Sequence, residues 1–366
     1  MKTSLVVYST CENAGDVLIE NAIRKLFEND LNFKIHAARN DVLDNLASNI
    51  IIGPGGLLSG SYRPDVSPDE MIIKFLNKDL LSTLSEKNIF FFGTGTNTSP
   101  LNKKTEKPFS KYSGEVLRKL FSLSKGIYLR GSSDINRLQR FSNLTDYEKF
   151  KFQPCPSIFL KRLYNLSIPK EDKIALNLPL GNIDVRKTAL PKFVEFAHSL
   201  GLTVTYVDNH PKDFNPSIYD VFDDCAHSYD MKKQLSSDNQ TSISNIYVNE
   251  WGDELALVRR YAGYRFAFGQ RLHAFLPFLA FSTPSVFLTS SPIRQTMPYD
   301  YFRNNIFLSK TSYSVDKLES LVNTMIVTLG TLIRREAYLI HDIEDHIGLL
   351  WDISMKNKYE LLSHCN

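Results

Sequence analysis

The chain reads Ile50-Ile51-Ile52-Gly53-Pro54-Gly55-Gly56 at residues 50–56, where three isoleucines run directly into a glycine-rich turn. The run is apolar throughout rather than alternating, which is typical of a parallel strand covered on both faces. Similar short runs alternate with helical patterns at residues 5–8, 33–36, 49–52, 89–92 and 127–129, and again at 174–178, 203–207, 246–248, 265–268, 286–288 and 306–308. This alternation predicts α/β layers joined by right-handed crossovers.

The length of 366 residues suggests two domains, at about 150 residues per domain. A polar, proline-containing segment at residues 164–172 precedes a fresh strand and is the expected boundary. We therefore predict two Rossmann-like, doubly wound domains, at residues 1–165 and 166–330, that face a shared cleft. Residues 331–366 are predicted to form a helical segment that crosses back over the domain junction.

Charge and apolar content exclude several classes of protein. The chain has 43 lysines and arginines against 40 aspartates and glutamates, and this net charge of +3 is too balanced for bulk binding of nucleic acid. No apolar stretch approaches the roughly 18 residues of a membrane span. The N-terminus reads as a strand rather than a signal peptide, and the four cysteines lack C-x-x-C spacing, so a cytoplasmic location is expected.

The acidic segment at residues 341–346 is the most metal-like part of the sequence. Its two histidines, His341 and His346, stand five residues apart on an expected helix and so do not share a face. No metal site is therefore predicted.

Polar residues follow the first expected strand, at the sheet edge where ligands of parallel sheets gather. Asn13, Gly15 and Asp16 stand at the start of a helix, whose free N–H groups can bind an anion or a polar ligand. The alternative is that Asn13 or Asp16 caps the helix while Gly15 permits the turn.

Glycine-rich turns follow two further strands. Gly53, Gly55 and Gly56 would let backbone amides approach a bound ligand closely. The pattern matches neither a Walker A loop nor G-x-G-x-x-G, so a nucleotide phosphate is not indicated, and a tight turn without a ligand is the alternative. Gly93 and Gly95, after the next strand, have the same two interpretations.

An arginine ends the expected strand at residues 127–129. Arg130 offers a planar fork for a carboxylate or a phosphate, and Gly131, Ser132 and Ser133 open a helix behind it. A surface arginine paired with a neighbouring acid is the alternative interpretation.

A second arginine follows the expected strand at residues 265–268. Arg271, Leu272 and His273 fall at the start of a helix, where orphan N–H groups and the positive end of the helix dipole disfavour a cation. Two cationic side chains at such a place suggest a bound anion. A core histidine bonded to a backbone carbonyl is the alternative, since pockets are few per protein.

Taken in order, four of these segments resemble the polysaccharide pyruvyl transferase family. They are Asn13-Ala14-Gly15-Asp16, Gly53-Pro54-Gly55-Gly56, Arg130-Gly131-Ser132-Ser133 and Arg271-Leu272-His273, and they extend over most of residues 5–290. The resemblance implies a two-domain fold like that of the glycosyltransferase-B enzymes. It places the site in the cleft, with the glycine-rich loops of the first domain on the acceptor side.

The resemblance also implies an activity, which is transfer of pyruvate from phosphoenolpyruvate to a sugar diol as a cyclic ketal in cell-surface polysaccharide biosynthesis. Arg130 and Arg271 would hold the anionic donor, and His273 would be the general acid and base. The substrate-binding residues implied are Asn13, Gly15, Asp16, Gly53, Gly55, Gly56, Gly131, Ser132, Ser133 and Leu272. The expected partners are phosphoenolpyruvate and a glycan or lipid-linked sugar, the latter at the inner membrane face, and no cofactor is expected.

Two other functions are compatible with the same architecture, because a fold does not determine a function. One is a glycosyltransferase that uses a nucleotide sugar. The other is a non-catalytic homologue in the polysaccharide machinery, against which the presence of both arginines and the histidine argues.

Overall fold

The computed structural model describes most of the chain. The described residues are 3–7, 14–37, 47–56, 58, 84–95, 111–142, 147–210, 213, 215–226, 254–288, 297–298, 300–302, 307–309 and 318–365. Asn13 and the expected strand at residues 246–248 lie outside them.

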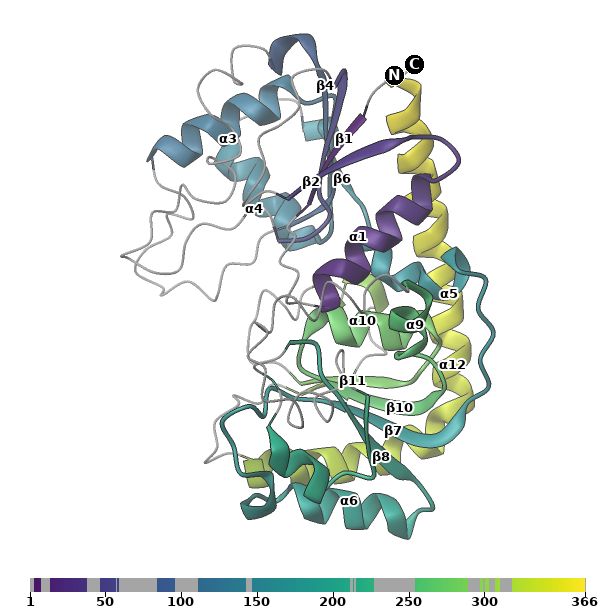
Figure 1. Ribbon diagram of the computed structural model, residues 1–366. Helices are drawn as coiled ribbons and strands as arrows, with labels where there is room; N and C mark the ends of the chain where they lie inside the picture. Colours follow the sequence, from purple (N-terminus) through teal and green to yellow (C-terminus); the bar gives the residue numbers. More distant parts are fainter. Residues whose placement is uncertain are drawn as a thin grey trace, which may run out of the picture.

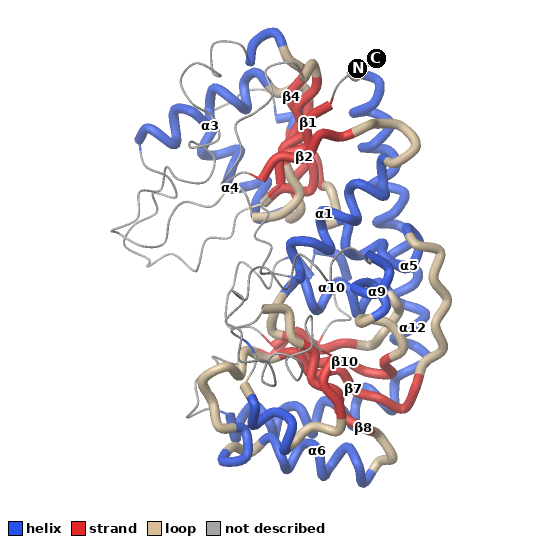
Figure 2. The backbone as a smooth tube through the Cα atoms, in the orientation of Figure 1, coloured by secondary structure: helices blue, strands red, loops and turns tan. Residues whose placement is uncertain are grey.

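Two parallel sheets form the framework (Figure 1, Figure 2). The strand order is β2-β1-β3-β4-β5-β6 in the first and β12-β11-β10-β7-β8-β9 in the second. The first contains β1 (Thr3–Val7), β2 (Phe33–Ala37), β3 (Asn49–Ile52), β4 (Asn88–Thr94), β5 (Gly126–Leu129) and β6 (Phe150–Phe152). The second contains β7 (Glu171–Asn177), β8 (Thr203–Val207), β9 (Asp224–Ala226), β10 (Tyr264–Gly269), β11 (Ser285–Leu288) and β12 (Phe307–Ser309). The predicted fold class, with two parallel α/β domains, is confirmed.

Helices cover both faces of each sheet. The α-helices are α1 (Ala14–Phe27), α3 (Lys111–Leu123), α4 (Ser132–Ser142), α5 (Leu160–Leu163), α6 (Leu190–Ser199), α9 (Glu254–Arg259), α10 (Leu272–Ala280) and α12 (Leu318–Ser363). Short 3-10 helices are η2 (Leu84–Glu86), η3 (Tyr147–Lys149), η4 (Pro156–Phe159), η5 (Val185–Lys187) and η7 (Pro216–Asp220). The first sheet packs on α3 and α4 on one face and on α1 and the end of α12 on the other. The second packs on α6 and the start of α12, and on α9 and α10.

The long helix α12 ties the two domains together (Figure 1). Its 46 residues span roughly 70 Å, at about 1.5 Å per residue. Near its start, Leu321 and Met325 are buried in the core of the second domain. Near its end, Lys358 Nζ donates to the carbonyl oxygen of Leu26 in α1 at 2.7 Å. The C-terminal segment therefore does cross back to the first domain.

The helix α12 passes without a break through residue 330, where the sequence analysis ends the second domain. Leu329 and Leu332 are fully buried on either side of Gly330. A glycine within a helix costs only about 1 kcal/mol, which this burial outweighs. The helical segment predicted for residues 331–366 is thus the second part of a longer helix.

The helices α1 and α10 lie between the two sheets (Figure 1) and bring the domains into contact. At the start of α1, the Ala14 N–H donates to the carbonyl oxygen of Asn209, which follows β8 of the second domain, at 3.0 Å. Ala14 and Leu18 share an apolar cluster with Val258 and Phe278 of the second domain. The N-terminus of α1 is therefore held against the second domain rather than facing open solvent.

The two glycine-rich strand ends of the first domain bond to each other. The Gly55 N–H donates to the Gly93 carbonyl at 3.2 Å, and the Gly95 N–H donates to the Gly55 carbonyl at 2.9 Å. The Gly53 N–H donates to the Val6 carbonyl at 2.8 Å. Gly53 and Gly55 thus extend the hydrogen-bonded edge of the sheet, and their backbone amides are used within the protein.

Replacing Gly53 with alanine should lower the free energy of unfolding by about 2–3 kcal/mol. Its φ of +128° disfavours a side chain, and a Cβ there would overlap the Phe92 carbonyl oxygen and Thr94 Oγ1. Chemical denaturation would measure the change. Gly201→Ala is the matched control, because Gly201 also has a positive φ (+74°) but no atom within 4 Å of the added Cβ. An equal loss in the two variants would contradict the packing argument.

Candidate active site

Arg271 stands at the junction between β10 and α10. It is the N-cap residue of α10 with an extended backbone (φ −85°, ψ 128°). Its N–H donates to Asn177 Oδ1, at the end of β7, at 3.2 Å. The Asn177 amide in turn donates to the Val207 carbonyl at the end of β8, at 2.6 Å. The start of α10 is therefore anchored to the carboxyl ends of two neighbouring strands.

The Arg271 guanidinium pairs with Asp213 through Nε and Nη2, one to each carboxylate oxygen. Asp213 is 1% exposed and Arg271 32%, so the acid is buried behind the arginine. Burial raises the pKa of Asp213 above its ordinary value, and the Arg271 guanidinium offsets part of that rise. Tyr206 donates its hydroxyl to the Asp213 carbonyl oxygen at 2.6 Å, which fixes this segment.

The starts of α1 and α10 meet at His273 and Asp16. His273 Nδ1 lies 3.8 Å from Asp16 Oδ1, and the two side chains are 14% and 11% exposed. A carboxylate at this distance favours the protonated imidazolium over the neutral ring. Asp16 also stands in the first turn of α1, where the helix dipole favours an anion. Gly15 beside it is buried.

Arg130 is buried at the end of β5, with 2% exposure, so the surface-arginine interpretation is wrong. Its N–H donates to the Thr94 carbonyl at 3.0 Å, and its Nε lies 4.0 Å from Asp134 Oδ2. A Cβ on Gly95 would overlap both the Arg130 and the Asp134 side chains. The glycine at residue 95 therefore makes room for the arginine.

The start of α4 carries a carboxylate from the second half of the chain. Asp300 Oδ2 accepts from the Ser132 N–H at 2.7 Å, and Asp300 Oδ1 accepts from the Ser132 hydroxyl at 2.5 Å. Gly131 lies directly beside it, since an added Cβ would be 3.4 Å from Asp300 Oδ2. Ser132, which the resemblance implies binds substrate, thus binds an internal carboxylate in this structure.

Tyr301 joins the two arginine motifs. Its hydroxyl accepts from the Cys155 N–H at 2.7 Å and donates to the Arg130 carbonyl at 3.0 Å. Its ring packs in one apolar cluster with Leu272 and Phe275 of α10 and with Ile19 of α1. Leu272, predicted to bind substrate, is 7% exposed and anchors α10 in this cluster instead.

The pKa of the buried Cys155 thiol is influenced by several of these residues. Burial raises the pKa of the Cys155 thiol, and its hydrogen bonds with Ser157 lower it. Arg130 lowers it further and Asp16 raises it, so both charges lie within electrostatic range of the thiol. Arg130 and Asp16 thus both act electrostatically on the Cys155 thiol, and the Cys155 N–H donates to Tyr301.

The predicted site residues thus divide into two groups. In one group, Asp16, His273 and Arg271 lie where the starts of α1 and α10 meet. Arg130 and Ser132 lie at the end of β5 and the start of α4, and they are joined to the second half of the chain through Tyr301 and Asp300. In the other group, Gly53, Gly55 and Gly56 are buried at the carboxyl end of the first sheet. The neighbouring glycine turn lies close to the start of η4, since a Cβ added to Gly93 would be 3.4 Å from Pro156.

Sequence reasoning missed Asp213, Asp300 and Tyr301. Asp213 follows the end of β8 in a polar segment, and that position was a usable signal. Asp300 and Tyr301 have no such signal, because they reach Ser132 and Cys155 across more than a hundred residues of chain.

Within the described ranges no group of three or more histidine, cysteine, aspartate or glutamate side chains could hold a metal ion. His341 pairs with Asp345 at 3.0 Å and His346 with Asp342 at 3.6 Å, so each histidine has an acid one turn away. None of the helices in the described part is long and apolar enough to cross a membrane.

The fold and this cluster define a two-domain α/β protein of the glycosyltransferase-B type, with a charged site where the domains meet. The sequence model of one family, polysaccharide pyruvyl transferase, matches residues 13–292. The chain belongs to this family of transferases, which confirms the resemblance. No curated protein matches it significantly.

Solved structures share the architecture at low identity. UDP-GlcNAc 2-epimerase from Neisseria meningitidis, bound to UDP-GlcNAc, has a TM-score of 0.54 at 11% identity, over 99% of this chain and 100% of the other. An uncharacterized protein of Klebsiella pneumoniae has 0.45 at 13%, over 85% and 93%. An alpha-glucosyltransferase in complex with UDP and DNA has 0.45 at 12%, over 99% of each chain. The first of these likenesses supports the fold assignment.

Proposed function

We propose that this protein transfers pyruvate from phosphoenolpyruvate to two hydroxyls of a sugar, forming a cyclic ketal in cell-surface polysaccharide biosynthesis. The observation that carries the proposal is the His273–Asp16 pair beside Arg271, in a chain whose family is that of the polysaccharide pyruvyl transferases. An acid–base group and a cation thus stand together at one helix start.

The donor suits the charges of the site. Phosphoenolpyruvate carries a carboxylate and a phosphate, and Arg271 and Arg130 supply two guanidinium forks for them. Because Arg271 gives Nε and Nη2 to Asp213, the donor would be bound by the N–H groups that remain on Nη1 and Nη2. Asp213 therefore acts as a positioning residue for Arg271.

The chemistry needs a group that moves protons near neutral pH. The enol C3 gains a proton, one sugar hydroxyl adds to C2, and the second hydroxyl then displaces phosphate from C2. The two hydroxyl protons lost are balanced by the one gained at C3 and the one that leaves with phosphate. His273 supports both transfers, because Asp16 stabilises the imidazolium between them.

The acceptor and the place of action belong to the same proposal. A sugar diol in a glycan or lipid-linked precursor would be bound from the first domain. The enzyme works in the cytoplasm, at the inner membrane face where its acceptor is lipid-linked, and it uses no cofactor beyond the donor.

A phosphate-release assay with phosphoenolpyruvate and a panel of galactosides, glucosides and mannosamine derivatives tests the proposal. Acceptor-dependent phosphate release, with an acid-labile pyruvylated product detected by mass spectrometry, is expected. Turnover with a nucleotide sugar and none with phosphoenolpyruvate would instead identify a glycosyltransferase. No turnover with either donor, in a folded protein, would identify a non-catalytic homologue.

A further inference from the structure

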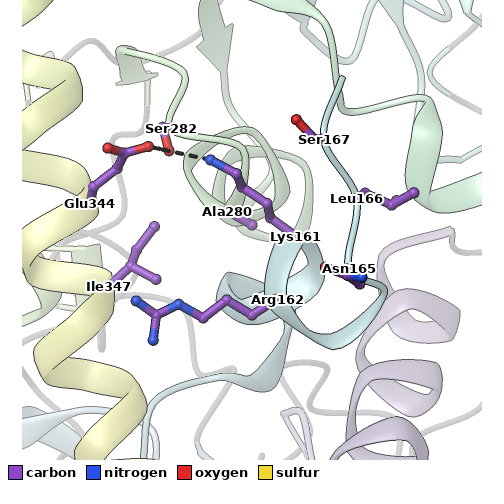
Figure 3. A pocket seen from close by; sticks show the side chains of 9 residues that line it. All are labelled: Lys161, Arg162, Asn165, Leu166, Ser167, Ala280, Ser282, Glu344 and Ile347. Atoms are coloured by element: carbon purple, nitrogen blue, oxygen red, sulfur yellow. Dashed lines mark hydrogen bonds and ion pairs between the residues drawn. The ribbon is translucent and has the colours of Figure 1, made fainter. Parts of the chain in front are cut away.

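We propose that a pocket at the far end of α10, lined by α5, the segment after it and α12, binds a small anionic carbohydrate such as a sugar phosphate or a sugar acid (Figure 3). This site is separate from the proposed active site. Its existence does not depend on the reaction performed there.

The pocket is an open cavity of about 460 Å³ that combines polar and apolar side chains. One wall is Lys161 and Arg162 of α5, the opposite wall is Glu344 and Ile347 of α12, and Ser282 follows the end of α10. Functional ligand pockets start at about 300 Å³, so the volume admits a monosaccharide with one charged substituent.

One side of the pocket has its charges already paired. Glu344 Oε1 accepts from the Ser282 hydroxyl at 2.8 Å and from Lys161 Nζ at 3.3 Å. Figure 3 shows Lys161 and Glu344 pointing toward each other across the top of the cavity. Glu344 balances the charge of Lys161. The charge of Arg162 is left over, so the charged side chains that line the pocket carry one net positive charge.

Arg162 is the group to which we assign the anion. Its guanidinium lies over the Trp351 ring, 5.8 Å from the centroid, with Gly348 beside it. Among the described residues no carboxylate lies within ion-pair distance of it, and no side-chain hydrogen bond satisfies its five N–H groups. An arginine stacked in this way presents the edge of its fork to a carboxylate or a phosphate.

Neighbouring groups suit the hydroxylated part of such a ligand. The side chains of Asn165 and Ser167 line the cavity without a hydrogen bond to any described residue. They supply amide and hydroxyl partners for sugar hydroxyls, while Ala280 and Ile347 offer apolar contact for the ring.

A third lysine, Lys170, lies near this region and is affected by the charge of Lys161. The pKa of Lys170 is lowered to about 7, mainly by burial and to a lesser extent by the charge of Lys161, while Glu336 and Glu344 oppose the shift. Lys170 Nζ donates to the Tyr264 carbonyl at 2.9 Å, beside the chain that follows Ser282. A bound anion would relieve this repulsion between cations.

The pocket lies beside the segment in which the chain passes from the first sheet to the second. The helix α10 has nine residues, so the pocket lies about 14 Å from the Arg271–His273 end of the helix. The lining segments α5 and α12 contact both domains, so a ligand here would bridge elements on which the domain arrangement depends.

Trp351 allows a direct test. The chain has two tryptophans, so a Trp251→Phe variant leaves Trp351 as the sole fluorophore, next to Arg162. Glucose 1-phosphate, glucuronate and inorganic phosphate would be titrated against its emission, with neutral glucose as the matched ligand. We expect a saturable change at millimolar concentration or below with the two anionic sugars and none with glucose. The two sugars distinguish phosphate from carboxylate recognition.

Three further variants test whether the change in Trp351 emission comes from a ligand bound in this pocket. Arg162→Gln should weaken binding at least tenfold, and Arg335→Gln should not, although Arg335 also stacks on an aromatic ring of α12, that of Tyr338. Arg271→Gln should keep the response, because the donor site is elsewhere. Should Arg162→Gln not fold, Ser167→Asp places a repelling carboxylate in the pocket and should abolish binding.

Several results would overturn the site. They are a response that survives Arg162→Gln or Ser167→Asp, an equal response to glucose, loss of the response in Arg271→Gln, or no saturable response at all. A protein that binds here but releases no phosphate from phosphoenolpyruvate would refute the proposed function alone.

Discussion

Replacing His273 with alanine should lower turnover at saturating phosphoenolpyruvate by about 100- to 10,000-fold, the usual contribution of a general acid and base. The imidazole lies 3.8 Å from Asp16 and is 14% exposed, so the pair is largely shielded from water. Its loss removes the group to which the proposed mechanism assigns delivery of the proton to C3. The donor KM should change far less, because the proposed mechanism assigns the anionic groups of the donor to Arg271 and Arg130.

His273→Gln should not restore turnover, since an amide can donate a hydrogen bond but cannot exchange a proton near neutral pH. Asp16→Asn should retain partial activity and shift the basic limb of the pH–rate profile to lower pH, because the imidazolium loses its carboxylate. Single-turnover pyruvyl transfer would measure both. Near-normal turnover in a folded His273→Ala protein would show that the histidine is structural.

Replacing Arg271 with alanine should cause two separate losses. Donor use, measured as kcat/KM for phosphoenolpyruvate, should fall roughly 10- to 150-fold, since a charged hydrogen bond contributes about 1.5–3 kcal/mol. The free energy of unfolding should fall by about 3 kcal/mol at pH 8, because Asp213 is left as a buried, unpaired carboxylate.

The stability loss should depend on pH in a defined direction. Burial raises the folded-state pKa of Asp213 above its unfolded value of 3.8, and removal of Arg271 raises it further. A carboxyl with a raised pKa is destabilising when ionised, and the penalty disappears as pH falls through the folded pKa. The deficit of Arg271→Ala should therefore shrink between pH 8 and pH 5.

The double variant Arg271→Ala/Asp213→Asn is the matched control. It removes the buried charge together with its partner, so denaturation curves should show a smaller deficit at pH 8 and little change toward pH 5. Donor use should stay as low as in Arg271→Ala. A pH-independent deficit in the single variant would show that Asp213 is protonated or solvated without the arginine.

Much of the fold could be predicted because buried parallel strands have a local signature. Runs such as Ile50-Ile51-Ile52 are apolar on both faces, and their strand bounds agree with the structure to within a few residues. The strands β6 and β9 were missed because they are three-residue edge strands with alternating or polar side chains. The continuity of α12 was missed because Gly330 resembles a break unless the burial of Leu329 and Leu332 is known.

The candidate site could be predicted only in part. Residues at strand ends are recognisable, so the sequence singles out Asp16, Arg130, Arg271 and His273 as candidates. Whether Arg130 is buried or exposed depends on Gly95 packing against it, which spacing alone does not reveal. Asp213 and Asp300 act on residues far away in sequence, so their partners could not be predicted, and no local signal marks Asp300 at all.

The sequence by itself determined the α/β class, the order of strands and helices, and the arginine and histidine side chains at helix starts. Local patterning suffices for these because hydrophobic periodicity and helix-start chemistry involve residues within a few positions of one another. Only the tertiary structure decided which of these side chains meet, which glycines pack against backbone, and which acid each arginine holds. Such contacts depend on how the two domains and α12 pack, and that geometry comes from burial and hydrogen bonds between residues hundreds of positions apart.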